Sequence, residues 1–257
     1  MPQPNDNTDY IWPHAPSGLI YVEQSLPGGE YRSTGLFDPS DVNQSTGAGR
    51  SFDNCKRVTS LFFDVDLIGL YDAIRVQAGQ ELEKKVKDRK AVMYANLGDE
   101  HMQDAYARMV EAMECIIDVM GDDPSCIVDS WWGLHAHYLL APGSDFDHHQ
   151  LQNLHKRIVE HANAKVAALF EDKYHLDWPK AFDATNDVGA RLARIPGSVN
   201  TKAPGRPRPV EVVSTYELAL DPDYIAKLDK ELATTAPQPK NTPSQGASSQ
   251  NSTGNTA

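Results

Sequence analysis

The sequence predicts a mixed domain of strands and helices, of the α+β or α/β class. Short apolar runs of strand length alternate with longer segments in which apolar residues recur about every 3.6 positions, as they do in a helix. The chain has 257 residues, of which 40% are hydrophobic. One compact domain with tails can therefore bury a sizeable core.

Short apolar runs next to turn residues predict the strands. They cover residues 18–23, 59–67, 124–141 and 210–213. Glycine and proline at 27–29 mark a turn after the first run. The run at 59–67 reads TSLFFDVDL and carries two carboxylates near its end. Helical periodicity predicts the helices, which we expect over residues 74–86, 102–120, 146–170 and 224–232.

The two ends of the chain differ in composition from its middle. Residues 1–17 are polar and rich in proline, which predicts a flexible arm. Residues 234–257 hold no aromatic side chain and one charge, which predicts a disordered tail or linker. Between them, residues 18–233 form the predicted domain.

Composition excludes several classes of protein. No apolar run approaches the roughly 20 residues of a membrane span, so we expect no membrane partner. Cys55, Cys115 and Cys126 form no CxxC pair, which argues against a disulfide framework or a recognisable zinc site and favours a reducing cytoplasm. The formal net charge of −12 counts against tight binding of nucleic acid.

One segment reverses the acidic balance. Between Asp187 and Glu211 there is no acidic residue, and the segment contains Arg191, Arg194, Lys202, Arg206 and Arg208. This local charge predicts an anion site; a solvated basic loop is the alternative.

Asp64-Val65-Asp66 places two carboxylates on one face of a predicted strand. Residues i and i+2 of a strand point the same way, with Cα atoms roughly 6.5–7 Å apart. Such acids repel each other unless a cation lies between them, and Mg²⁺ and Mn²⁺ prefer oxygen ligands. The motif therefore predicts a divalent-metal site; a strand end whose acids reach water is the alternative.

Two further segments carry candidate site residues. In SWWGLHAHY, Gly133 leaves room beside His135 for a bulky ligand such as a triphosphate; a core histidine is the alternative, and His137 fits that description too. Asp183 precedes the basic segment. It can supply a metal ligand there, while Arg and Lys side chains contact phosphates; a surface turn at Pro196-Gly197 is the alternative.

Together the three motifs resemble the archaeo-eukaryotic primase superfamily, in its phage and plasmid primase-polymerase branch. The family shows an apolar strand ending in DxD or DxE, then a strand leading to a site histidine, often SGxGxHxY. An Asp follows, with R-x-x-R-x-P-G-S/T-x-N-x-K. This chain has SLFFDVDL, PSCIVDSWWGLHAHYLL and FDATNDVGARLARIPGSVNTK within residues 55–215. It departs from the family at Trp131 and Trp132, where small residues are usual.

The resemblance implies a fold, a reaction and roles for residues. The fold is α+β, with an RRM-like antiparallel catalytic sheet and a smaller N-terminal α/β unit. The reaction is DNA-templated primer synthesis from NTPs or dNTPs by two-metal nucleotidyl transfer, with two Mg²⁺ or Mn²⁺ ions. Asp64, Asp66 and Asp183 would bind metal. His135 would contact the phosphates of the nucleotide, and its triphosphate would be bound by Arg191, Arg194 and Lys202.

The implied partners are a single-stranded DNA template and nucleotides, with a replicative helicase, in the same chain or separate, as a further candidate. The implied location is the cytoplasm of a bacterium, an archaeon or a phage-infected host. Two alternatives stay open: a gap-filling repair polymerase of the same superfamily, and a non-catalytic RRM-like nucleic-acid-binding module of a replication initiator. The second would use exposed aromatics such as Trp131 and Trp132 to stack on bases.

Overall fold

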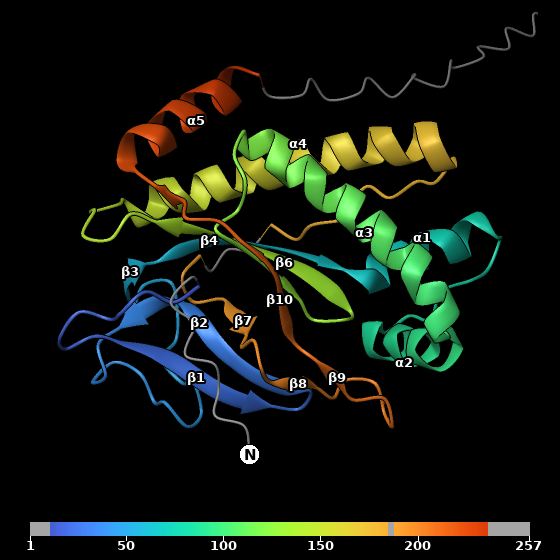
Figure 1. The fold of residues 1–257 in the computed structure, drawn as a ribbon, viewed down its shortest axis with the longest axis horizontal. Coiled ribbons are helices and arrows are strands. Elements are labelled where there is room, and N and C mark those ends of the chain that lie inside the picture. The colour runs from blue at the N-terminus through green and yellow to red at the C-terminus, as the bar shows by residue number, and fades with distance from the viewer. Residues whose placement is uncertain (1–10, 185–187, 236–257) are drawn as a thin grey trace, which may run out of the picture.

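The computed structural model describes residues 11–184 and 188–235, and it is a mixed α+β structure (Figure 1). The larger sheet has the antiparallel order β4-β6-β5-β10, and a short strand, β11, runs parallel to β6. Its strands are β4 (Ser60–Asp66), β5 (Cys126–Asp129), β6 (Gly133–Leu140), β10 (Glu211–Thr215) and β11 (Ala219–Leu220).

A second sheet comes mainly from the N-terminal part of the chain. In it β2 pairs with three strands, all antiparallel, and one of these, β7, comes from the basic segment. The strands are β1 (Ile20–Leu26), β2 (Gly29–Phe37), β3 (Cys55–Val58) and β7 (Leu192–Arg194). A separate pair joins β8 (Val199–Asn200) to β9 (Arg208–Pro209).

The predicted N-terminal α/β unit differs from what is observed, because the described residues 11–58 contain strands and no helix. A sheet needs cover on an apolar face, and here the larger sheet provides it. A second core cluster lies between the two sheets, with Phe62, Val128 and Ala193 among its members. Ile11 and Trp12 are buried in the same cluster, so this part of the predicted flexible arm is packed. Residues 1–10 and 236–257, which hold the first part of the predicted arm and nearly all of the predicted tail, lie outside the described residues.

The helices are α1 (Leu67–Gln77), α2 (Val86–Asn96), α3 (Asp99–Met120), α4 (His148–Tyr174) and α5 (Pro222–Thr234). The last three confirm the helices predicted over 102–120, 146–170 and 224–232. The helix predicted over 74–86 is wrong. The chain leaves α1 after Gln77, where the N–H groups of Ala78 and Gln80 close the last turn on Ile74 and Arg75, and a new helix begins at Val86. The apolar periodicity of the sequence continues through residues 78–85, but the backbone hydrogen bonds of the helix end after Gln77.

The strand predicted over 124–141 is a hairpin of β5 and β6. Its turn is fixed by the side chains of Asp129, which accepts the N–H of Trp131, and Ser130, which donates to the carbonyl of Gly133 at 2.9 Å. Trp131 has φ 68°, in the left-handed region, and so cannot continue a strand. These side-chain hydrogen bonds form a turn where the apolar pattern alone predicts one continuous strand.

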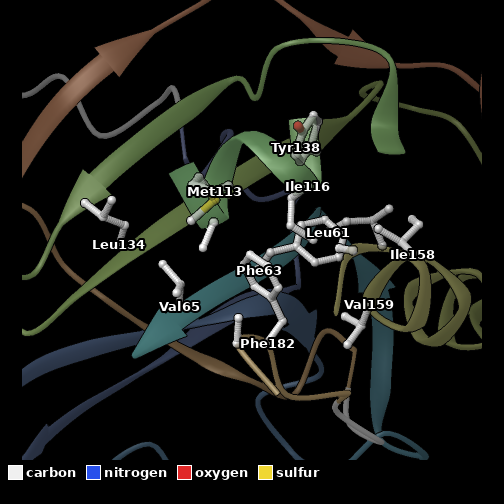
Figure 2. Packing of buried hydrophobic residues seen from close by; sticks show 14 of the residues in the cluster. Leu61, Phe63, Val65, Met113, Ile116, Leu134, Tyr138, Ile158, Val159 and Phe182 are labelled. Atoms are coloured by element: carbon white, nitrogen blue, oxygen red, sulfur yellow. The ribbon is translucent and has the colours of Figure 1, made fainter. Parts of the chain in front are cut away.

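The main core lies between the larger sheet and the helices α3 and α4, which cover one face of it (Figure 1). Leu61, Phe63 and Val65 alternate along β4 and are at most 1% exposed. Figure 2 shows them meeting side chains of α3 and α4, such as Ile116 and Ile158. The alternate residues of β4 therefore point to the other face, where the candidate site lies. None of the helices in the described ranges is long and apolar enough to cross a bilayer.

Candidate active site

Asp64 lies at the centre of the candidate site. It pairs in register with His135 of β6, and both side chains leave the sheet on the face opposite the helices. The two oxygens of Asp64 lie 3.6 Å from His135 Nε2 and 3.6 Å from Arg191 Nη2, which is too long for a direct hydrogen bond. The carboxylate is 27% exposed, so it faces a positive neighbour while keeping access to solvent.

Asp66 ends β4 and begins the following helix. One of its oxygens accepts the N–H of Ile68 at 3.2 Å as the N-cap of α1. The other accepts from Lys90 Nζ of α2 at 2.8 Å. Burial acts to lower the pKa of Lys90, but the charge of Asp66 and their hydrogen bond outweigh it, so the pKa of Lys90 is raised. Lys90 is therefore a cation at neutral pH, bound to an acid of the predicted metal site.

His135 is a neutral base in this site. It is 6% exposed. Burial lowers the pKa of His135 to about 3, with a further contribution from the charges of Arg194, Lys202 and Arg191. Its Nδ1 is buried without a hydrogen-bond partner among the described residues. A neutral imidazole beside cations can donate to or accept from a ligand without adding charge.

His137 lies deeper, at 0% exposure, between the rings of Phe62 and Trp12. Burial lowers the pKa of His137 well below its usual value, and His135 adds to the effect. Neither ring nitrogen has a partner in the described part of the chain, so His137 is a core side chain whose polar atoms are unsatisfied.

Asp183 lies next to the point where the chain touches β4. Phe182 forms an antiparallel bridge with Val65, so the backbone of Asp183 follows directly beside Asp64. Its side chain is exposed, and residues 185–187 beyond it lie outside the described ranges. Within those ranges no three His, Cys, Asp or Glu side chains form a group that could hold a metal ion. The structure thus brings Asp64 and Asp66 together but does not add Asp183 as a third ligand.

The basic segment reaches the site because β7 joins the N-terminal sheet. Arg194 pairs in register with Tyr31 of β2, and its guanidinium carbon lies 4.7 Å from the centre of that ring. Arg194 Nη1 donates to the carbonyl of Gly28 at 2.9 Å, whereas Nη2 is buried and has no partner among the described residues. Burial lowers the pKa of Arg194. A buried guanidinium with an unused donor fits an anionic ligand.

Lys202 and the loop before it complete the basic side. Asn200 is fully buried and donates to the carbonyl of Ser130 at 2.6 Å, while its own oxygen accepts the N–H of Lys202 at 3.1 Å. This ties the basic segment to the β5–β6 turn. Desolvation lowers the pKa of Lys202, and the charge of Arg194 lowers it further. A cation whose pKa is lowered by a neighbouring cation lies in a site that favours negative charge.

Two glycines have roles that the sequence did not indicate. A Cβ on Gly133 would lie 2.7 Å from the carbonyl oxygen of Val65, so this glycine lets β4 and β6 approach and does not leave space for a ligand. A Cβ on Gly29 would lie 2.5 Å from Arg194 Nη1. The turn at 27–29, predicted as a simple connection, is therefore part of the wall that positions Arg194.

Lys90, Tyr31 and Tyr94 are the members of this site that sequence analysis missed. The pKa of each tyrosine is raised, first by burial, and both interact with the charges of Arg194 and Lys90. Lys90 belongs to a helix of low apolar content between two motifs, and no spacing rule joins it to Asp66. The one available signal was a lysine-rich stretch soon after the DxD motif, which is equally typical of a solvated helix face.

Comparison of the chain with protein-family models, with curated proteins and with solved structures gives no match.

Proposed function

We propose that this chain is the catalytic domain of a primase-polymerase of the archaeo-eukaryotic primase superfamily, a nucleotidyltransferase that copies a single-stranded DNA template. The observation that carries the proposal is the pairing of Asp64 and Asp66 with four cations around them. These cations are Lys90, Arg191, Arg194 and Lys202. Two acids beside an excess of positive charge suit a polyphosphate ligand that arrives with divalent ions.

The arrangement of elements supports the same proposal. An antiparallel β4-β6-β5-β10 sheet has helices on one face and the acids on the other, as an RRM-like catalytic sheet would. The acids come from the end of a buried strand, which holds them in place with little freedom. A rigid strand end is a suitable base for positioning reacting groups.

The chemistry of the acids fits Mg²⁺ or Mn²⁺. Asp64 offers carboxylate oxygens with no hydrogen-bond donor within 3.5 Å among the described residues, and Asp66 offers the oxygen that Lys90 now contacts. Asp64 and Asp66 would hold the ions, and Asp183 would join them if its exposed carboxylate turns toward the bridge at Val65. Bound divalent ions would lower the pKa of an attacking hydroxyl and neutralise the leaving pyrophosphate.

The chain's own residues would hold the nucleotide. Arg194, fixed by Gly28 and Tyr31, presents its unpaired Nη2 donor, and Lys202 and Arg191 add charge that a triphosphate would neutralise. His135, being neutral, would contact a phosphate through a ring nitrogen. Preorganised donors of this kind need no rearrangement during transfer, so they stabilise the charge that develops in the transition state.

The non-catalytic binding module has less support. Base stacking needs exposed aromatic rings, but Trp132 is 3% exposed and packs in the main core. The ring of Trp131 is covered by Arg208, whose guanidinium carbon is 4.2 Å from the ring centre. The N-terminal sheet also covers part of the sheet face that such a module would use.

The test is primer synthesis on a circular single-stranded DNA with labelled NTPs or dNTPs, in Mg²⁺ or Mn²⁺, without added primer. We expect short products of this reaction. Products that form only when a primer is supplied would favour the gap-filling polymerase of the same superfamily. No nucleotide incorporation under either condition, with the protein folded, would contradict the proposal.

A further inference from the structure

Lys90 occupies the position of a cation at Asp66. Its Nζ lies 2.8 Å from Asp66 Oδ2, and the other oxygen of that carboxylate is engaged by the N–H of Ile68. Both oxygens of Asp66 are thus used, whereas those of Asp64 lie 3.6 Å from their nearest partners. The two acids are prepared differently for a metal: Asp64 is open, and Asp66 is already paired.

The helix that carries Lys90 is attached at a few defined points. Met93 is the one buried side chain of α2, all of whose residues the structure describes. Arg89 pairs with Asp72 of α1 at 2.9 Å. Arg206 of the basic segment donates to the carbonyl oxygens of Tyr94 and Leu97, at 3.2 and 2.6 Å. The helix therefore connects the acids to the basic segment and faces Lys90 toward both.

A divalent ion and the Lys90 ammonium compete for the same oxygen. Mg²⁺ binds oxygen at about 2.0–2.1 Å and keeps several waters, so it takes up the space in front of the carboxylate. An ammonium held there would be repelled by the ion's charge. Lysine has a flexible four-carbon stem, and the Lys90 side chain is 26% exposed, so it has room to turn away.

We propose that Lys90 is an exchangeable internal cation, which neutralises Asp66 in the ligand-free protein, is displaced by the divalent ion and then contacts the triphosphate of the bound nucleotide. The inference rests on the proposed function, because it requires a metal site at Asp64 and Asp66. Lys90 would pair first with the carboxylate of Asp66 and then with the triphosphate of the nucleotide. The lysine would thereby couple metal binding to nucleotide binding.

The test measures binding of Mn²⁺ alone by calorimetry or by electron paramagnetic resonance, for the parent and for Lys90→Met, Lys90→Gln and Lys87→Met. Lys87 is an exposed lysine of the same helix, so its variant controls for the loss of one positive charge. We expect both Lys90 variants to bind Mn²⁺ about twofold to fivefold more tightly than the parent. This ratio corresponds to the interaction free energy of one partly exposed ion pair. Lys87→Met should match the parent.

The second measurement is binding of ATP or dATP without template at saturating Mn²⁺, where the Lys90 variants should bind more weakly than the parent. Thermal melts without metal check that each variant is folded. Unchanged Mn²⁺ affinity in both Lys90 variants, or unchanged nucleotide affinity, would overturn the inference. The proposed function would still stand if Asp64→Asn weakens Mn²⁺ binding. A parent that binds no Mn²⁺ would overturn both.

Discussion

The two faces of β4 and β6 use burial in different ways. Toward the helices, Leu61, Phe63 and Val65 present apolar side chains to the main core, where Phe63 also stacks on the buried His155. On the opposite face, the same two strands present Asp64 and His135, close to cations and with polar atoms left unpaired. The helix-facing side stabilises the fold, whereas the unpaired polar atoms on the opposite side reduce that stability. Substitutions on the two faces should therefore separate stability from activity.

Phe63→Ala tests the stabilising face and should have the largest effect. Phe63 is 1% exposed and stacks on His155 with ring centres 4.8 Å apart. Its truncation should cost about 3–5 kcal/mol of unfolding free energy, because a large cavity cannot close fully. Urea unfolding measures it, with the exposed Val76→Ala as control. A loss below about 1 kcal/mol would mean that this face is not the stabilising one.

Asp64→Asn tests the charged face. We expect synthesis to fall by about 100-fold to 1,000-fold, the range for removing one preorganised group that stabilises the transition state. Stability should change by less than about 1 kcal/mol, because its contacts with Arg191 and His135 are long and partly exposed. Primer extension and a thermal melt measure the two effects, with the exposed Asp53→Asn as control. Full activity in Asp64→Asn would eliminate the nucleotidyl-transfer proposal.

Lys202→Ala should act on substrate binding. We expect the apparent KM for nucleotide to rise roughly tenfold, the loss of one charge-assisted contact, with a smaller change in kcat. Lys230→Ala, an exposed lysine on α5, is the matched control for charge. Steady-state kinetics at fixed template provide the comparison. Identical constants for Lys202→Ala and the parent would make the basic segment a surface feature without a part in nucleotide binding.

His137→Phe tests the unpaired polar atoms between the two sheets. The folded ring stays neutral, since burial and His135 hold the pKa of His137 well below its usual value. The unfolded chain takes up a proton on this ring below about pH 6.5. The unfolded state then binds more protons, so parent stability should fall as pH is lowered from about 6.5. Each such histidine contributes up to about 1.4 kcal/mol per pH unit.

Urea unfolding between pH 6.5 and 4.5 should therefore show a shallower pH slope for His137→Phe than for the parent. His155 also contributes to the slope. Burial lowers the pKa of His155 to about 4; its hydrogen bond with the carbonyl of Phe62 acts to raise the pKa, and the charge of Arg191 acts to lower it. His14→Phe, at an exposed position, should keep the parent slope. An equal slope in His137→Phe would show that this ring is protonated in the folded protein.

Much of the fold could be predicted from periodicity, and the errors lie where local polar groups decide. The long apolar periods of α3 and α4 leave few other structures available, because their faces must be buried. The hairpin at 129–133 and the break after Gln77 depend on single hydrogen bonds and a left-handed residue, which leave no periodic signal. Asp64 and His135 could be placed on one face because motif spacing on a strand fixes the face of each side chain, whereas Arg194 was predicted only as part of a basic segment whose strand, β7, no pattern indicated.

The sequence by itself determined a mixed domain of strands and helices, the strand that carries Asp64 and Asp66, and the basic segment after Asp183. Each of these follows from residue patterns within a short stretch of sequence. The tertiary structure alone decided that β7 joins β2, that Gly28 and Gly29 shape the wall around Arg194, and that Lys90 pairs with Asp66. Such contacts join residues far apart in the sequence. Their geometry depends on how two sheets and a helix pack, which no local pattern encodes.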